Sequence, residues 1–436
     1  VTSRGVATWA DPDKTPGESG YRFLYLGTLD GRLVALDAAT GQPVAAFGDG
    51  GSVDLTRGVG SVEAGDYQVT SPPAVIGDLI VVGSAIGDNR EVESERGIVR
   101  AFDARTGALR WNWDPIPRDA ADPAYQTWNG PLAHRTGAAN AWAPISADPA
   151  RDLLFVPTSS PSPDYYGGDR IGQNLYADCV VALRAATGEP VWHFQVVHHD
   201  LWDYDVPMQP LLFDLPGDGG TTPAVAIGTK MGHLFVLHRE TGEPLFPVEE
   251  RPVPQTDVPG EATWPTQPFP TKLPLFGLRT LTADDAWGLT ERDRAAARAW
   301  IAGLRSDGPF TPVSLRGSVQ APSNFGGFNW GGLSYDPERR LLVGATNRIA
   351  AVAQLLHRAN AAAPAAPPDR FPIEVGPQRQ TPYIVERTYL IDAAARLPVT
   401  PPPWGTLAAV DLASGDRKWE TPLGLMADPS DHPDAV

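Results

Sequence analysis

Ala101-Phe-Asp-Ala-Arg-Thr-Gly107-Ala-Leu-Arg-Trp111 is the most informative stretch of the chain, because its pattern returns several times. It joins apolar residues typical of a strand to a Thr-Gly pair and then to a tryptophan. Glycine in such a pair predicts a tight turn with positive φ. Further copies, not all with the tryptophan, are Ala35–Gly41, Ala182–Trp192, Val236–Phe246 and Ala409–Trp419. The chain is therefore expected to repeat a strand–turn–strand unit.

Apolar strands also lie upstream of these copies. Examples are Phe23–Gly27, Leu79–Gly83, Leu153–Pro157 and Leu341–Ala345. Repeated units of short antiparallel strands are typical of a β-propeller. The long interval between Gly242 and Gly415 has room for a degenerate blade and insertions. We expect an all-β propeller with about six blades and with loop and short-helix insertions.

Three segments interrupt the repeats. Residues 247–289 are rich in proline and are expected to wrap the surface. Thr290 is a predicted helix N-cap, with Asp293 placed to reach back to it and an Ala-rich run behind them. Residues 361–368 are an Ala/Pro-rich segment, expected to be an exposed loop. None resembles an interdomain linker, so one decorated domain is predicted.

Composition excludes several classes of protein. The 436 residues include 44 glycines and 45 prolines, which favours many turns over long helices. The formal charge of −17 disfavours binding to nucleic acid. The single cysteine, Cys179, excludes an intramolecular disulfide and a cysteine-ligated zinc site. No apolar run reaches the roughly 20 residues that a membrane-spanning helix needs.

The densest polar cluster is Val197-His-His-Asp-Leu-Trp-Asp-Tyr-Asp205. Two histidines and three aspartates so close together suit a metal site or a general base. They equally suit a solvated loop whose aspartates cap turns, and the residues alone leave both open. Trp202 and Tyr204 favour a half-buried position, where a carboxylate becomes more basic.

Other polar residues end predicted strands or stand beside glycines. Asp88 follows one strand and Ser160 another, and spacing alone makes ordinary turn chemistry the better interpretation there. Arg4 and Lys230 are candidates for a pocket that holds an anion in this acidic chain. The sequence shows no Rossmann, Walker A, zincin or nucleophile-elbow motif, so it lacks support for nicotinamide, ATP, zinc-protease or serine-hydrolase chemistry.

Taken in order, these motifs resemble the quinoprotein dehydrogenases, which use pyrroloquinoline quinone (PQQ). The most similar branch comprises the membrane-bound glucose, quinate and polyol dehydrogenases, and the likeness runs from Arg4 to Gly424. The block His198–Asp203 is its specific element, whereas non-catalytic propellers share the Thr-Gly repeat. The other matching motifs are Arg4-Gly-Val, Thr70-Ser-Pro-Pro, Gly87-Asp-Asn, Trp142-Ala-Pro, Thr229-Lys-Met-Gly, Asn324-Phe-Gly and Pro403-Trp-Gly.

The resemblance implies a site that oxidises an alcohol, which needs a base for the hydroxyl proton and an acceptor for the hydride. Asp203 is similar to the family's catalytic carboxylate, and Lys230 to the cation that contacts the quinone oxygens. The other PQQ contacts that it implies are Arg4 and Thr70 at the carboxylates, Trp142 under the ring, and Asn324 and Trp404 at the pocket wall.

The resemblance also implies Ca²⁺ or another divalent cation beside PQQ, with Asp88, Ser160 and Asp203 as ligands. Ser160 stands where alcohol-oxidising relatives have an asparagine ligand. Trp9 falls where the glucose-type enzyme has a histidine near the substrate, and Trp9 and His198 are assigned to the substrate side. The single cysteine excludes the vicinal disulfide of many alcohol-oxidising relatives.

The implied function is oxidation of a sugar, cyclitol or other polyol, with electrons passed to membrane ubiquinone. The implied location is the periplasm, with an inner-membrane anchor in a segment outside this sequence. Family members have eight blades, so residues 1–436 are expected to form one incomplete propeller domain without the first and last blades.

The alternative function is that of a non-catalytic propeller that serves as a protein-binding scaffold. Composition and repeats fit both functions. Only an enzyme has a reason to gather the predicted acids, cations and indole around one central cavity. The residues that discriminate between the two are Arg4, Asp88, Trp142, Asp203, Lys230 and Asn324.

Overall fold

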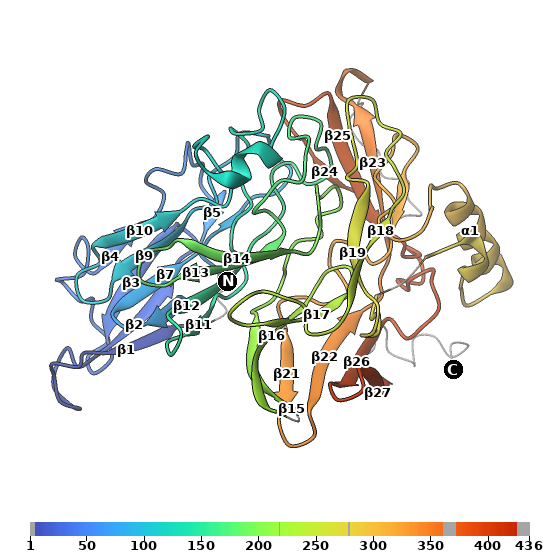
Figure 1. The fold of residues 1–436 in the computed structure, drawn as a ribbon. Helices are drawn as coiled ribbons and strands as arrows, with labels where there is room; N and C mark the ends of the chain where they lie inside the picture. Colours follow the sequence, from blue (N-terminus) through green and yellow to red (C-terminus); the bar gives the residue numbers. More distant parts are fainter. Residues whose placement is uncertain (1–4, 218, 278–279, 361–371, 425–436) are drawn as a thin grey trace.

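The computed structural model describes residues 5–217, 219–277, 280–360 and 372–424. Within these ranges the chain forms mostly short strands in antiparallel sheets, with one α-helix (Figure 1). The predicted all-β propeller is confirmed. Arg4 and segment 361–368, for which the sequence made predictions, lie outside the described residues.

Five sheets follow one another as the blades of the propeller. Blade one comprises β1 (Ala7–Ala10), β2 (Arg22–Gly27), β3 (Arg32–Asp37) and β4 (Ser52–Asp54); blade two comprises β6 (Ala74–Ile76), β7 (Leu79–Val82), β9 (Val99–Asp103) and β10 (Leu109–Trp113); blade three comprises β11 (Ser146–Asp148), β12 (Leu153–Pro157), β13 (Cys179–Arg184) and β14 (Pro190–Gln195); blade four comprises β15 (Leu211–Gly217), β16 (Gly220–Gly228) and β17 (Leu234–His238); blade five comprises β21 (Leu333–Asp336), β22 (Leu341–Asn347), β26 (Gly405–Asp411) and β27 (Asp416–Pro422). The first strand of each blade packs beside the first strand of the next, from β1 through β6, β11 and β15 to β21. These first strands therefore form the inner edge of the arc.

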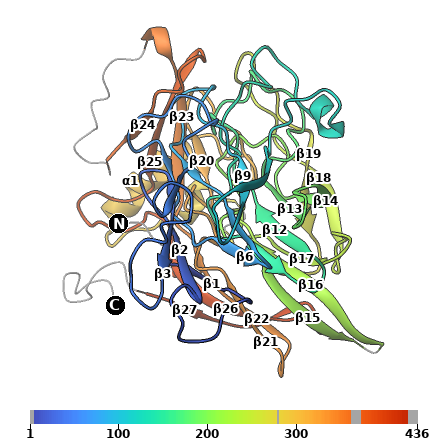
Figure 2. The same cartoon turned by 90° about the vertical axis from the view of Figure 1, so that its left-hand side faces the viewer.

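A further sheet is inserted into blade five. Its strands are β20 (Ser318–Gln320), β23 (Ala351–His357), β24 (Glu374–Gly376) and β25 (Tyr383–Tyr389). Three of these strands lie in the chain between β22 and β26, and both views place β23, β24 and β25 above the strands of blade five (Figures 1 and 2). The described residues thus hold six sheets of three or four strands, five of them in the arc and the sixth inserted.

The remaining elements are short. They are the strand pairs β5 (Tyr67–Gln68) with β8 (Ala85–Ile86) and β18 (Val248–Pro252) with β19 (Thr266–Pro270), the helix α1 (Glu291–Ala302), and the 3₁₀ turns Pro123–Thr127, Ala283–Asp285 and Arg358–Asn360. The proline-rich segment 247–289 therefore contains a two-stranded ribbon as well as loops.

The Thr-Gly turns come directly after the third strand of a blade, and their glycines have the predicted positive φ. At Gly188 (φ +77°) and Gly242 (φ +75°), an added Cβ would lie 2.6 and 2.5 Å from the indoles of Trp111 and Trp192, respectively. Trp192 also donates its indole N–H to the Arg239 carbonyl at 3.1 Å. The tryptophan of one blade thus packs on the turn of the next, where only glycine fits.

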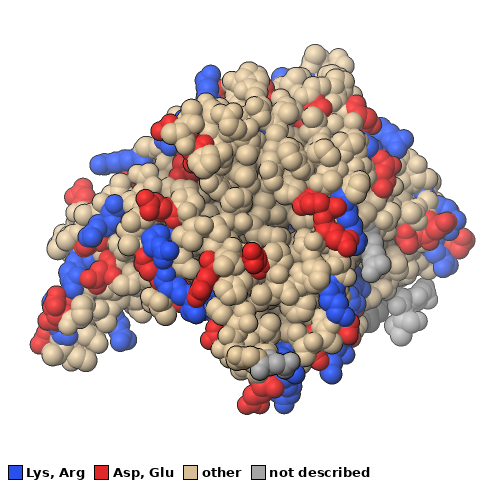
Figure 3. Space-filling view, in the orientation of Figure 1, with Lys and Arg blue, Asp and Glu red and all other residues tan. Residues whose placement is uncertain are grey.

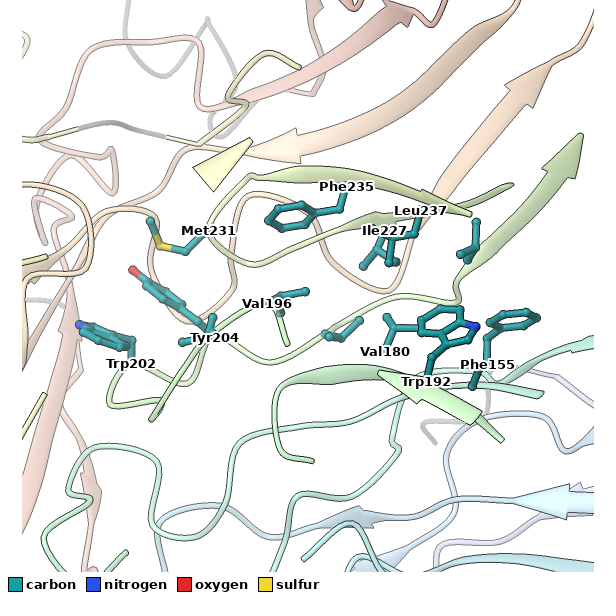
Figure 4. Close-up of a cluster of buried hydrophobic side chains, with 14 of the residues drawn as sticks. Phe155, Val180, Trp192, Val196, Trp202, Tyr204, Ile227, Met231, Phe235 and Leu237 are labelled. Atoms are coloured by element: carbon teal, nitrogen blue, oxygen red, sulfur yellow. The ribbon is translucent and has the colours of Figure 1, made fainter. Parts of the chain in front are cut away.

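The hydrophobic core lies between neighbouring blades. One cluster joins Phe155 and Trp192 of blade three to Ile227 and Phe235 of blade four (Figure 4). Burying one large apolar side chain contributes roughly 1.5–3 kcal/mol, so many such contacts fix the blades relative to one another. The same cluster continues to Trp202, within the His-rich block.

Helix α1 begins at the predicted N-cap. Thr290 Oγ1 accepts the Asp293 N–H at 3.2 Å, and Asp293 Oδ2 accepts the Thr290 N–H at 3.0 Å. We expect Thr290→Ala to cost about 1 kcal/mol, because it leaves a helix N–H without its acceptor. A thermal melt measures the loss, and the exposed Thr15→Ala variant serves as a control. An unchanged melting temperature for Thr290→Ala would contradict this assignment.

Acidic and basic side chains are interspersed over the face shown in Figure 3, and its central part is largely uncharged. Within the described residues, no helix has the length and apolar character required to cross a bilayer.

Candidate active site

One cavity of about 270 Å³ gathers most of the polar residues that the sequence singled out. Its lining comes from loops beside the inner strands of blades two to five and from the β5–β8 pair. The lining residues are Gln68, Thr70, Ala85, Ile86, Asp88, Asn140, Trp142, Ser159, Ser160, Asp164, Asp203, Asp205, Lys230 and Asn324. Seven predicted site residues therefore share this cavity: Thr70, Asp88, Trp142, Ser160, Asp203, Lys230 and Asn324.

Lys230 is the positive centre of the cavity. Its Nζ lies 2.6 Å from Asp203 Oδ1 and 2.6 Å from Asp205 Oδ1, and all three side chains are buried. Lys230 stands in a turn whose backbone also accepts the Gly327 N–H at 2.6 Å. An added Cβ at Gly326 would lie 2.6 Å from the Lys230 Cα, so glycine is required for this close approach.

Residues 202–205 alternate between the core and the cavity. Trp202 and Tyr204 are buried in the inter-blade cluster and stack at a centroid distance of 6.1 Å (Figure 4). Asp203 and Asp205 line the cavity instead. The aromatic residues thus anchor the loop that presents both carboxylates.

Trp142 is fixed in the cavity wall from two directions. Its indole N–H donates to Asp205 Oδ2 at 2.5 Å, and its carbonyl accepts the Ser71 hydroxyl at 2.5 Å. The flat indole therefore has one orientation and lies next to the carboxylate pair that Lys230 bridges.

Negative charge exceeds positive charge in the cavity lining. Four aspartates face one ammonium group, and Asp88 is the only exposed member of the four. Burial raises the pKa of Asp203 to about 8; attraction to Lys230 opposes this, and repulsion by Asp205 adds to it. Burial and repulsion by Asp88 also raise the pKa of Asp164. Although burial alone lowers the pKa of Lys230, Asp203 and Asp205 raise it overall, so the lysine stays charged.

A divalent cation suits this donor set. Ca²⁺ prefers carboxylate, hydroxyl and carbonyl oxygens, and Asp88, Ser160 and Asp203 offer oxygen atoms in a cavity with surplus negative charge. Within the described ranges, however, no three acidic, histidine or cysteine side chains already converge on a metal-sized position. The residues therefore fit the ion chemically without forming a closed set of ligands.

In the His-rich block 197–205, one aspartate caps turns and another lines the cavity, so each of the two interpretations left open by the sequence applies to part of the block. Asp200 is a buried turn cap: its Oδ1 accepts the Trp202 N–H at 3.0 Å, and its Oδ2 accepts the Tyr204 N–H at 2.9 Å and the Ser160 hydroxyl. Burial raises the pKa of Asp200, and these hydrogen bonds oppose the rise. Asp200 thus shapes the loop, and Asp203 serves the cavity.

Three predicted site residues lie elsewhere. Trp9 packs in the core of blades one and two and donates its indole N–H to Asp78 at 3.2 Å. His198 holds the β18–β19 ribbon, with Nε2 3.0 Å from Glu250 Oε1. Trp404 donates its indole N–H to a loop carbonyl and contacts the ring of another tryptophan. The predicted substrate-side roles of Trp9 and His198, and the cofactor contact of Trp404, receive no support from this geometry.

Sequence reasoning missed Arg387, on β25 of the inserted sheet. Its Nη1 lies 3.7 Å from Asp203 Oδ2. No motif surrounds Arg387, and a lone arginine in a strand gives no signal. Asp164 also lines the cavity; it is buried, and Asn89 donates to its Oδ2 at 2.7 Å.

Comparisons with known proteins agree on one family. The family described as "PQQ: Glucose/ethanol/alcohol dehydrogenase, beta-propeller domain" matches residues 1–435. The quinate/shikimate dehydrogenase (quinone) of Acinetobacter baylyi is 38% identical over 422 residues, 93% of this chain and 51% of that protein. Quinoprotein glucose dehydrogenase A of Acinetobacter calcoaceticus is 37% identical over 430 residues, 97% of this chain and 53% of that protein.

The fold also matches solved structures of quinoprotein dehydrogenases. The crystal structure of quinohemoprotein alcohol dehydrogenase from Comamonas testosteroni matches with a TM-score of 0.63 and 24% identity, over 96% of this chain and 53% of that one. The chain spans about half the length of the curated relatives that it matches. On its sequence and its fold, the chain belongs to the PQQ-dependent glucose/ethanol/alcohol dehydrogenase β-propeller family.

Proposed function

We propose that the protein is a PQQ- and calcium-dependent dehydrogenase that oxidises a hydroxyl group of a sugar, cyclitol or other polyol. The observation that carries this proposal is the convergence of Asp88, Trp142, Asp203, Lys230 and Asn324 on one cavity. A scaffold propeller has no reason to bury three carboxylates and a lysine there, because burying unneeded charge is costly.

The cavity suits a flat, anionic cofactor. Trp142 offers a rigid aromatic surface, and aromatic rings bind planar ring systems by stacking. Thr70 and Asn324 offer polar groups at the wall, and Lys230 offers a buried charge. PQQ, when bound, supplies the hydride acceptor, and a divalent cation makes that acceptor more electrophilic. Arg4 keeps its predicted role at the PQQ carboxylates as part of this proposal.

The protein's own residues carry the acid–base part of the reaction. Asp203, whose pKa burial raises to about 8, accepts the substrate hydroxyl proton in its ionised form, which the neighbouring Lys230 and Arg387 stabilise. Lys230 keeps Asp203 oriented through Oδ1 and places positive charge where negative charge develops. Asp205 fixes Trp142 and shares the lysine, so the indole, the lysine and the base form one unit.

The proposed substrate class, electron acceptor and location rest on the relatives. By their names, they act on quinate or shikimate and on glucose, and another is a glycerol dehydrogenase subunit of Gluconobacter oxydans. They support the polyol class without choosing a member of it. Membrane ubiquinone as electron acceptor and an anchored, periplasmic location belong to the same proposal.

Reconstitution tests the proposal directly. Purified protein is incubated with PQQ and CaCl₂, and reduction of an artificial dye is followed over a panel of quinate, shikimate, glucose, glycerol and ethanol. We expect dye reduction with a polyol, dependent on PQQ and lost when a chelator removes the calcium. PQQ that fails to bind, or bound PQQ without turnover of any panel member, would contradict the proposal.

A further inference from the structure

The inserted sheet contacts two residues that line the active-site cavity, Asn324 and Asp203. On a strand, residues two apart share a face, so Arg387 and Tyr389 project from the same face of β25. Both reach groups of the cavity. The Tyr389 hydroxyl donates to Asn324 Oδ1 at 3.3 Å, and Arg387 Nη1 lies 3.7 Å from Asp203 Oδ2.

Arg387 is held rigidly by partners outside the cavity. Its Nη1 donates to the Tyr165 hydroxyl at 2.7 Å, and its Nε and Nη2 donate to Glu374 Oε2 at 3.0 and 2.5 Å. Glu374 stands directly opposite Arg387 in the β24–β25 register, which explains their pairing. Only 18% of the Arg387 side chain is exposed, so its guanidinium position is well defined.

The two oxygens of Asp203 therefore face two cations from different sheets. Lys230, from the turn after β16, holds Oδ1 at 2.6 Å, and Arg387, from β25, faces Oδ2. Asp203 itself has φ +61°, in the left-handed region that aspartate adopts more readily than most L-residues.

We propose that Arg387 is a positioning residue, which fixes the orientation of the Asp203 carboxylate from the side opposite Lys230. The inserted sheet is then part of the catalytic apparatus and not only a decoration of the propeller. This inference rests on the proposed function of Asp203 as the base. It goes beyond that function by assigning a role to a sheet that the propeller repeat does not contain.

The test compares Arg387→Gln with Arg387→Lys in the PQQ- and calcium-loaded protein. The glutamine variant removes the positive charge beside Asp203. It is expected to lower kcat roughly 10- to 100-fold with little change in KM, because a misplaced base slows proton transfer in the transition state but hardly affects substrate binding. The lysine variant is expected to regain part of kcat. Arg379→Gln, in an exposed pair with Glu91, is the matched control and should keep wild-type kcat.

A purely structural role for Arg387 makes a different prediction. Glu374→Gln weakens the β24–β25 pair without removing the cation beside Asp203. If Arg387 only holds the sheet, Glu374→Gln should lower kcat as much as Arg387→Gln does, whereas the positioning role predicts a smaller loss for Glu374→Gln, in which Tyr165 still holds the guanidinium beside Asp203. An equal loss in both variants, or wild-type kcat in Arg387→Gln, would overturn the proposal.

A structural readout separates this inference from the proposed function. Crystal structures of the wild-type protein and of Arg387→Gln should show Asp203 in one orientation in the first and in a rotated or mixed orientation in the second. An unmoved Asp203 in the variant overturns the positioning role, whatever the turnover. A displaced Asp203 in a protein that oxidises no polyol would refute the proposed function and leave the positioning role standing.

Discussion

Asp203→Asn is expected to abolish polyol oxidation while PQQ remains bound. Asparagine has nearly the same shape and tolerates the left-handed backbone at this position, where φ is +61°, so the loop should keep its conformation. It cannot accept the hydroxyl proton, and loss of a general base costs about 10²- to 10⁴-fold in rate. Steady-state dye reduction measures kcat, and the PQQ absorbance of the washed protein measures cofactor retention.

The exposed Asp30→Asn variant, on blade one, is the matched control and should keep wild-type kcat. Turnover by Asp203→Asn at the wild-type rate would remove Asp203 from the role of base. Loss of PQQ together with activity would show instead that Asp203 serves cofactor binding first, and the assignment of its role would have to change.

Lys230→Met is expected to destabilise the fold more than any other single change discussed for the cavity. The methionine keeps the apolar stem of the side chain, but it leaves Asp203 and Asp205 without the ammonium that lies 2.6 Å from each of them. Removing one partner from a buried ion pair costs about 3–5 kcal/mol, because the remaining charge is buried without compensation. Urea unfolding of the calcium-free protein measures this loss as a lower midpoint.

Two further variants test whether the loss in Lys230→Met comes from the buried ion pairs. Lys272→Met removes a half-exposed lysine that lies 3.4 Å from Asp416, and such pairs contribute about 0–1 kcal/mol. Its midpoint should hardly move. Adding Asp205→Asn to Lys230→Met removes one of the two uncompensated carboxylates and should recover part of the loss. Equal midpoints for Lys230→Met and Lys272→Met would show that the buried bridge does not stabilise the fold.

Local patterns were sufficient to predict the repeated unit. The Thr-Gly turns, the upstream strands and the Thr290 capping box depend on residues a few places apart, and the structure has each of them where the sequence indicated. Local patterns did not distinguish a blade from an inserted sheet, since the residues of β23 to β25 have the same strand character in either case.

Motif likeness predicted seven of the residues that line the cavity, whereas three other residues that it singled out lie elsewhere. Asp203 and Lys230 were paired correctly across the chain. Trp9 and His198 were placed at the substrate by position in a motif, yet both are satisfied by partners outside the cavity. Position in a motif identifies a residue, but the direction of its side chain depends on packing that the motif does not record.

The sequence alone determined where strands and turns alternate, because each depends on residues close together in the chain. It also determined which chemical groups the site can draw on. It could not specify that Trp192 packs on the turn glycine of the next blade or that Arg387 faces Asp203, and both contacts arise only in the folded molecule. Backbone conformation depends mainly on local sterics, which a short stretch of sequence already contains. Contacts between side chains from different sheets depend instead on how whole blades pack, which is set by buried surface summed over many residues.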